Sequence, residues 1–136
     1  MISNLNEYFA SKYEFYLDEV TYRRKSAPDS ASNLTLNCHD NYRAEVKGSS
    51  VVLTITRHLS FDQEALFELI VSFGAILTFN AEKAAEYDWN KIDLAEEFKN
   101  NGDFVTANLT NRITFLVGAI TSSYGQAPII LPPIIK

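Results

Sequence analysis

Cysteine is scarce in this sequence, and Cys38 is the one thiol among 136 residues. A single cysteine excludes an intramolecular disulfide, which fits a reducing compartment. The first seven residues lack the basic and apolar regions of a signal peptide. The most apolar stretch, residues 66–77, contains Glu68 and is too short to span a bilayer. These absences predict a cytoplasmic protein that does not insert into a membrane.

Positive charge is also limited, because 12 Lys and Arg residues are set against 17 Asp and Glu residues, for a net charge of −5. A phosphate backbone repels such a chain, and the basic run at residues 23–25 is too short to reverse this. The five glycines form no phosphate-binding motif, and no serine lies in a nucleophile-elbow motif. We therefore expect no nucleic-acid partner.

One local arrangement, Cys38-His39-Asp40, suggests a nucleophile. Successive residues of a strand point to opposite faces, so this thiol and imidazole cannot pair in a regular strand, and an activated thiol needs a neighbouring base. A metal site built from His39, His58 and Asp40 would require the strands to align them, and the sequence lacks the Cys/His spacing of zinc sites. We predict no catalytic residue, no metal and no cofactor, and hence a protein that is not an enzyme.

What the chain does contain is enough apolar material for a core. Hydrophobic residues make up 46% of the sequence and charged residues 21%, which is typical of a globular protein. At this length we expect a single domain over residues 1–136. The clearest pattern lies at residues 65–79, where every odd position is apolar. Period two predicts a long strand with one face against a core.

Three other segments also predict strands, near residues 14–24, 34–46 and 51–59. The second alternates apart from Asp40, whereas the first alternates poorly. After these predicted strands, the spacing of the apolar residues changes from that of a strand to that of a helix. A cap at Asp93 predicts a short helix that ends at Asn101-Gly102, and helical spacing predicts a main helix over about 108–123. The fold class is therefore predicted as α+β, a four-stranded antiparallel sheet followed by a main helix packed on one face. Residues 1–10 are expected to form a loose helical turn.

The last part of the chain carries two specific motifs. Residues 111–125 read Asn-Arg-Ile-Thr-Phe-Leu-Val-Gly-Ala-Ile-Thr-Ser-Ser-Tyr-Gly, and Pro128 and Leu131-Pro132-Pro133-Ile134 follow. Together with Gly74-Ala75-Ile76-Leu77, this order resembles SecB, the bacterial export chaperone family. SecB proteins usually continue into a C-terminal helix, whereas this sequence stops at Lys136, so the resemblance is to a divergent SecB-like sequence. It implies a Greek-key sheet with its helix on one side.

The resemblance also implies a function and a site. SecB proteins hold unfolded or secretory polypeptides, without ATP, in a groove between the sheet and the loop near the helix. The aromatic-rich segments of this chain suggest the following groove residues: Phe15, Leu17, Tyr87, Trp89, Phe98 and Phe104. Ordinary core packing is the alternative for each of them, because aromatic residues dominate cores as well as interfaces.

Self-association is expected on two grounds. In SecB two sheets join edge to edge in a dimer, and two dimers pack their helices into a tetramer. The corresponding interface residues here would be Ile113, Leu116, Val117 and Ile120. Independently, one helix is too narrow to cover four long strands, so surplus apolar surface on residues 65–79 and in the proline-broken segment 128–136 would meet another chain.

SecB also docks to the translocation ATPase SecA through an acidic patch on its sheet. At the corresponding positions this chain has Ile70 and the basic pair Arg23-Arg24, with Asp18, Glu19 and Glu68 nearby. SecA is therefore included among the predicted partners. Two alternatives stay open: a SecB-fold interaction protein for one defined partner, of the antitoxin type, and a small-molecule binder or enzyme. The order of sheet before helix and the lack of convergent polar residues count against the second.

Overall fold

The computed structural model describes residues 2–25, 35–62 and 66–122, so the expectations for residues 123–136 lie outside the described ranges. The elements follow one another in this order: η1 (Leu5–Tyr8), β1 (Glu14–Arg24), β2 (Leu36–Lys47), β3 (Ser50–Phe61), β4 (Phe67–Thr78), α1 (Ala81–Ala84), η2 (Trp89–Lys91), α2 (Leu94–Asn101) and α3 (Asp103–Ser122). This is the predicted α+β order, and η1 is the helical turn expected near the start of the chain.

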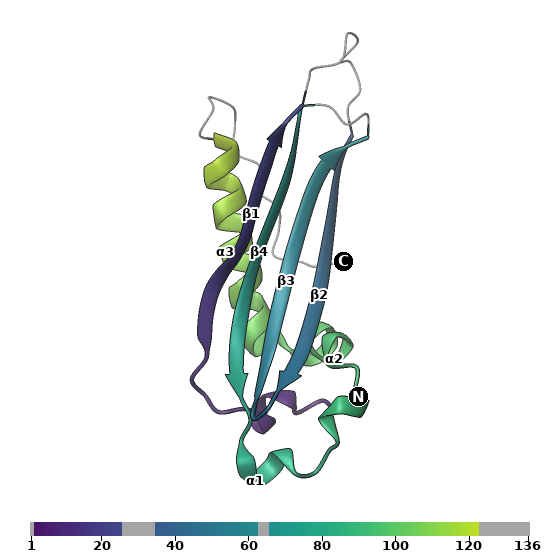
Figure 1. The fold of residues 1–136 in the computed structure, drawn as a ribbon, viewed down its shortest axis with the longest axis vertical. Coiled ribbons are helices and arrows are strands. Elements are labelled where there is room, and N and C mark those ends of the chain that lie inside the picture. The colour runs from purple at the N-terminus through teal and green to yellow at the C-terminus, as the bar shows by residue number, and fades with distance from the viewer. Residues whose placement is uncertain (1, 26–34, 63–65, 123–136) are drawn as a thin grey trace.

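The four strands form one antiparallel sheet in the order β1-β4-β3-β2 (Figure 1). Strands β2, β3 and β4 are consecutive neighbours and form an antiparallel meander. The β2–β3 turn contains Gly48 at a φ of +60°, which glycine adopts without steric cost. Strand β1 pairs with β4 instead of β2, and this crossover completes the predicted Greek key.

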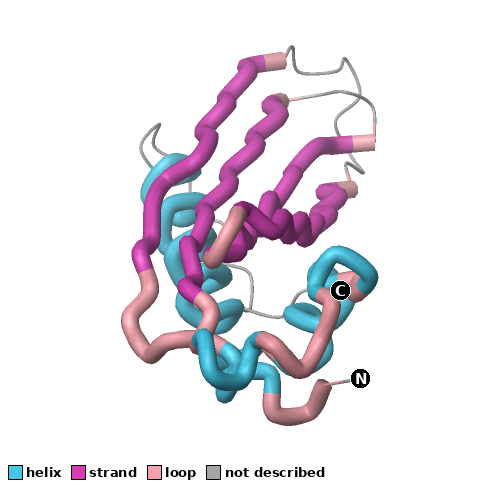
Figure 2. Tube along the Cα trace, turned by 60° about the horizontal axis from the view of Figure 1, so that its bottom comes forward, coloured by secondary structure: helices cyan, strands magenta, loops and turns pink. Residues whose placement is uncertain are grey.

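The helices gather on one face of the sheet and at one end of it (Figure 2). Helix α3 runs along β4 and β3, while α2 packs against β2. The apolar positions of β4 and β3 that face the helices are buried: Val51, Leu53, Ile55, Leu59, Phe67, Leu69, Val71, Ala75 and Leu77. The core therefore lies between β3, β4 and α3, and it extends to the lower end of the sheet in Figure 1.

Helix α2 begins as the sequence predicts, because the Asp93 side chain accepts a hydrogen bond from the Glu96 backbone N–H at 3.2 Å. Helix α3 begins earlier than predicted, directly after Gly102. Gly102 is buried, its N–H donates to the Phe98 carbonyl at 2.9 Å, and a Cβ there would collide with that carbonyl oxygen, so glycine fits the tight turn that ends α2.

One expectation about the sheet is wrong. Surplus apolar surface is expected on residues 65–79, yet the apolar side chains of β4 are buried or half-buried within the chain. The reason is topological: β4 is an interior strand, flanked by β1 and β3 and covered by α3. The exposed apolar surface lies instead on β1, the neighbouring edge strand.

Two charged residues, Asp40 and Arg57, interrupt the apolar rows that face the core, and they form an ion pair with each other. Asp40 in β2 lies directly opposite Arg57 in β3, on the face that carries the core. Arg57 Nε and Nη2 donate to the two carboxylate oxygens at 2.9 and 3.0 Å, and Nη1 donates to Thr114 Oγ1 of α3 at 3.1 Å. The side chains are 1% and 5% exposed, so a buried ion pair links β2, β3 and α3.

Candidate functional site

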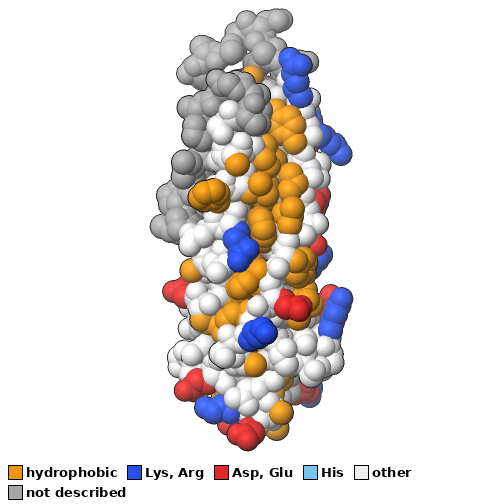
Figure 3. Space-filling model, turned by 90° about the vertical axis from the view of Figure 1, so that its left-hand side faces the viewer, with side chains coloured by type: hydrophobic (Ala, Val, Ile, Leu, Met, Phe, Trp, Pro, Cys, Tyr) orange, Lys and Arg blue, Asp and Glu red, His pale blue; other side chains and the backbone are white. Residues whose placement is uncertain are grey.

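Large apolar side chains are exposed along one side of the molecule. Leu17, Val20 and Tyr22 of β1 are 53%, 42% and 40% exposed, and Phe115 of α3 is 85% exposed. We call these four residues the β1–α3 strip. Figure 3 shows apolar side chains gathered in a column on this side of the molecule. Exposed apolar patches on soluble proteins commonly mark binding surfaces.

The strip exists because β1 contains a bulge. Leu17 lies opposite Phe73 and Val20 lies opposite Val71, so both point to the helix-covered face although they are three residues apart. The pairing shifts at Asp18, which is the extra residue that places them on the same face. The bulge also accounts for the poor alternation of this segment in the sequence. Among the described residues β1 has a strand neighbour on one side only, β4.

Polar donors lie beside the strip on α3. The Arg112 guanidinium carbon is 4.7 Å from the centre of the Phe15 ring, and Arg112 Nε donates to Asn108 Oδ1 at 2.6 Å. With Asn111 and Phe115, these two α3 residues line a shallow surface pocket of about 320 Å³. An apolar surface edged by a cation and amides is suited to a polypeptide that carries both apolar side chains and backbone carbonyls.

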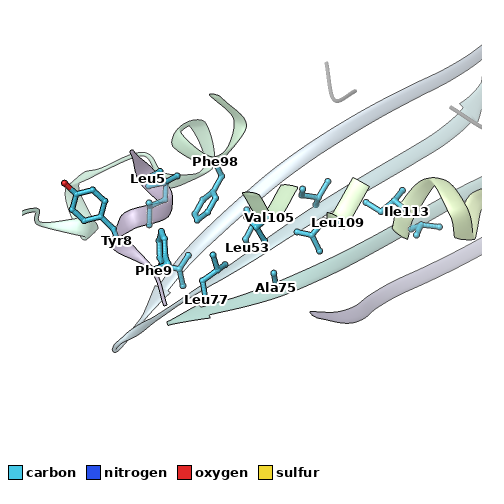
Figure 4. Close-up of a cluster of buried hydrophobic side chains, with 14 of the residues drawn as sticks. Leu5, Tyr8, Phe9, Leu53, Ala75, Leu77, Phe98, Val105, Leu109 and Ile113 are labelled. Atoms are coloured by element: carbon cyan, nitrogen blue, oxygen red, sulfur yellow. The ribbon is translucent and has the colours of Figure 1, made fainter. Parts of the chain in front are cut away.

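A second group of aromatic residues lies at the lower end of the sheet. We call residues 79–102, between β4 and α3, the connector. Phe9 is the centre of this group, with ring centroids 5.1 Å from Phe79, 5.6 Å from Phe98 and 6.2 Å from Trp89. Figure 4 shows Phe98 and Leu5 close to Phe9 beside the end of the sheet. We call Phe79, Trp89, Phe98 and Phe104, whose rings surround Phe9, the aromatic cluster.

The six predicted groove residues are therefore divided between two places. Leu17 belongs to the strip and Phe15 is half-buried beneath Arg112, whereas Trp89, Phe98 and Phe104 belong to the aromatic cluster and Tyr87 packs at its edge against Trp89. Tyr13 connects the two places, because its ring centroid is 6.3 Å from Phe15 and 5.9 Å from Phe104. Trp89 and Phe98 are buried within the chain, as the alternative of core packing expects.

The predicted interface residues also differ from one another. Ile113 and Val117 are buried against the sheet of their own chain, whereas Leu116 and Ile120 are half-buried. Phe115, which the sequence reasoning missed, is the most exposed large apolar residue of α3. The sequence could have indicated it, because Phe115 is a large apolar residue that lies outside the helical stripe of buried residues on α3. Val20 and Tyr22 were missed because the bulge hid their alternation.

Cys38 is exposed, but its surroundings favour the neutral thiol over the thiolate. Partial burial and the Asp40 carboxylate raise the pKa of the thiol, although Arg57 acts in the opposite direction. The same causes, burial and then Asp40, raise the pKa of Tyr42 to about 12. Within the described part of the chain, no three His, Cys, Asp or Glu side chains are grouped so as to hold a metal ion.

Two carboxylates on the outer face of the sheet, Asp18 and Glu68, have partners within the chain. Ser72 Oγ donates to Asp18 at 2.9 Å, and Glu68 lies 2.8 Å from His58 Nε2 and opposite Arg23. The hydrogen bond from His58 lowers the pKa of Glu68. This arrangement mixes charges of both signs, so it does not favour the acidic patch on which the SecA prediction depends.

The sequence matches no family model and no curated protein. The structure does match, and the class it defines is the SecB-like fold: a four-stranded Greek-key sheet covered on one face by a long helix, which confirms the predicted fold class and resemblance. A solved structure of this fold is the Mycobacterium tuberculosis Rv1957 SecB-like chaperone in complex with a ChAD peptide from the Rv1956 HigA1 antitoxin. It aligns with a TM-score of 0.72 and 18% identity, over 97% of this chain and 91% of that one. No described helix of the present chain is both long and apolar enough to cross a membrane.

Proposed function

We propose that this chain binds extended apolar segments of other polypeptides along Leu17, Val20 and Tyr22, the β1 part of the β1–α3 strip, and keeps them from aggregating without ATP. The observation that carries the proposal is the exposure of Leu17, Val20 and Tyr22 on an edge strand. An extended client can form main-chain hydrogen bonds with such an edge while its alternate side chains contact these residues. Binding the unfolded state of a client opposes its aggregation by mass action, so no energy source is required.

Self-association is the second part of the proposal. Phe115 exposes most of its side chain on α3, with Leu116 and Ile120 half-buried beside it. We propose that this face of α3, and not the buried Ile113 and Val117, contacts further copies in a dimer or tetramer. Several strips in one assembly would raise the avidity for a long client, so each single contact can stay weak. We place this activity in the cytoplasm, where Cys38 would stay reduced.

The test is an aggregation assay with a reduced, unfolded client protein at increasing chain concentration. The double variant Leu17→Thr/Val20→Thr removes apolar surface and keeps residues that favour strands. Losing the two contacts weakens binding by about 2 kcal/mol, or about 30-fold. The control variant Asn41→Thr/Arg43→Thr changes two exposed residues of β2, the other edge strand, and should suppress aggregation like the natural chain.

Two outcomes contradict the proposal. In the first, the natural chain does not suppress aggregation at any ratio to the client. In the second, the strip variant and the control variant suppress it equally. Self-association is tested separately by light scattering, where Phe115→Ser should lower the solution mass. An unchanged mass, or a natural chain that is a monomer, removes that part of the proposal.

A second candidate function is an interaction protein for one defined partner. The observation in its favour is that the Rv1957 SecB-like chaperone was solved with a peptide from an antitoxin. This function predicts tight one-to-one binding of a particular protein and weak binding of unrelated unfolded chains. Titrations with several unrelated unfolded clients distinguish the two, because a general holding protein binds them with similar affinity.

A further inference from the structure

The segment that precedes β1 packs as though it were a bound peptide. Residues 2–9 contain one 3₁₀ turn and a single bridge to the sheet region, between Phe9 and Phe79. The side chains of Ile2, Leu5, Tyr8 and Phe9 are all buried, whereas the residues between them are exposed. A short, mostly irregular segment that inserts each of its large apolar side chains has the features of an extended apolar ligand.

The surface that receives this segment is the aromatic cluster. Phe9 contacts aromatic rings from the connector and the start of α3, and Tyr8 packs edge-on against Tyr87 and Trp89 at 5.4 Å each. Figure 4 shows Phe98 of α2 facing Leu5 and Phe9 across this junction. Three of the residues predicted for a client groove, Trp89, Phe98 and Phe104, therefore already contact a peptide segment of their own chain.

Few polar contacts fix the segment, and they divide into two kinds. The backbone contacts are Asn80 N–H to the Tyr8 carbonyl and Ala10 N–H to the Thr78 carbonyl, both at 2.8 Å, and any extended peptide can form such bonds. The others are side-chain contacts with the connector: Lys83 Nζ donates to Glu7 at 3.3 Å, and two further bonds depend on carboxylates of the connector. Tyr8 Oη donates to Glu86 at 2.7 Å, and the Ile2 N–H donates to Glu97 at 2.9 Å.

We infer that the aromatic cluster is a second polypeptide site, and that residues 2–9 are a displaceable internal ligand that occupies it. The inference rests on the proposed polypeptide binding and adds a second site to it. The occupant it commits to is an apolar peptide with aliphatic residues three apart followed by an aromatic pair, the spacing of Ile2, Leu5, Tyr8 and Phe9. An internal competitor lowers the apparent affinity for such peptides, because a peptide can bind only during the fraction of time in which the segment has left the site.

The test weakens the segment without altering the apolar walls of the site. In the full chain, Glu86→Ala/Glu97→Ala removes both carboxylate acceptors. The matched control, Glu82→Ala/Glu96→Ala, removes two exposed carboxylates of the same connector that have no bond to the segment. The probe is a fluorescein-labelled synthetic peptide of residues 1–12 with Tyr8→Phe and an N-methylated Ile2, so it uses neither carboxylate and its own affinity for the site is the same in every variant. Its binding is measured by anisotropy.

The expected result is that the peptide binds the Glu86→Ala/Glu97→Ala variant about tenfold more tightly than it binds the natural chain or the control, the factor that two weakened hydrogen bonds imply. Amide exchange of residues 2–10 should accelerate by a similar factor while exchange in β3 and β4 is unchanged. A peptide with Ser in place of its Leu5 and Phe9 should not bind.

Two results overturn the inference. Equal peptide affinity for all three proteins, with or without faster exchange, means that residues 2–9 do not compete with the peptide for the cluster. A lowered melting temperature with exchange accelerated throughout the sheet means that the segment is an integral part of the core. The strip variant Leu17→Thr/Val20→Thr separates this inference from the proposed function. Adding it to the Glu86→Ala/Glu97→Ala variant should leave peptide binding intact even where client holding is lost.

Discussion

Removal of the Asp40 carboxylate should destabilise this protein more than a typical point mutation. Arg57 lies in the core-facing row of an interior strand, where its neighbours along the strand are Ile55 and Leu59. Its guanidinium is 1% exposed and its charge is balanced by Asp40 at 2.9 and 3.0 Å. In Asp40→Ala the cation stays buried without its partner, because Thr114 supplies only a neutral acceptor.

The expected magnitude follows from that burial. Breaking one side of a buried, hydrogen-bonded ion pair costs about 3–5 kcal/mol. A domain of this size has a free energy of unfolding of about 5–15 kcal/mol, so Asp40→Ala removes a large part of it. In a urea titration the midpoint should fall while the slope is unchanged, and the melting temperature should drop by roughly 10 °C or more.

The double variant Asp40→Leu/Arg57→Met is the decisive comparison. It removes both charges and fills the site with apolar atoms, so its stability should lie within about 1–2 kcal/mol of the natural protein. The single variants Asp40→Leu and Arg57→Met should each be far less stable than the double variant. The reasoning is refuted if Asp40→Ala costs less than about 1 kcal/mol, or if the cost of the double variant equals the sum of the single costs.

Three further predictions concern the outer face and the connector. Gly74→Ala should lower the free energy of unfolding in urea by about 1 kcal/mol at most, because the new Cβ would collide with the outer end of the half-buried Tyr16 ring, which has to move aside. The His58 hydrogen bond lowers the pKa of Glu68, so its stabilising effect is present above the ordinary glutamate pKa of about 4.3 and is lost as pH falls through the lowered value. Melting temperatures of the natural protein and Glu68→Gln should therefore differ at pH 6 and converge near pH 3. Asp93→Ala should cost about 1 kcal/mol in urea through loss of the α2 cap.

Each of these predictions has a control and a contrary result. For Gly74→Ala the control is Tyr16→Ala in the same background, which removes the ring and should recover part of the loss. No recovery would contradict the proposed collision. A difference in melting temperature between the natural protein and Glu68→Gln that is the same at every pH would contradict the link between the lowered Glu68 pKa and stability. For Asp93→Ala the control is Asp88→Ala, because the Asp88 side chain caps only the three-residue η2. An equal cost for both variants would contradict the role of Asp93 as the stabilising cap of α2.

Much of the fold could be predicted from local patterns. The odd-position alternation in β4, the glycine turn before β3 and the Asp93 cap each depend on residues close together in the sequence. The candidate site could be predicted only in part. Leu17 was found, but Val20 and Tyr22 were hidden by the bulge at Asp18, which no periodicity reveals.

The Asp40–Arg57 pair is the clearest case of a feature that no local pattern contains. Each residue by itself breaks an apolar row, and their attraction depends on the register that places β2 against β3. The burial of Trp89 and Phe98 is similar, because the residues that cover them come from the segment before β1, about 80 and 90 residues earlier.

The sequence by itself determined the main elements, their order and the apolar faces of β3 and β4, because backbone sterics and side-chain periodicity act over a few residues. Only the tertiary structure decided which apolar faces are covered. Strand β4 became an interior strand beneath α3, whereas β1 became an edge with Leu17, Val20 and Tyr22 exposed. Coverage depends on which distant segments become neighbours, and that choice minimises the exposed apolar surface of the whole chain, not of any one segment.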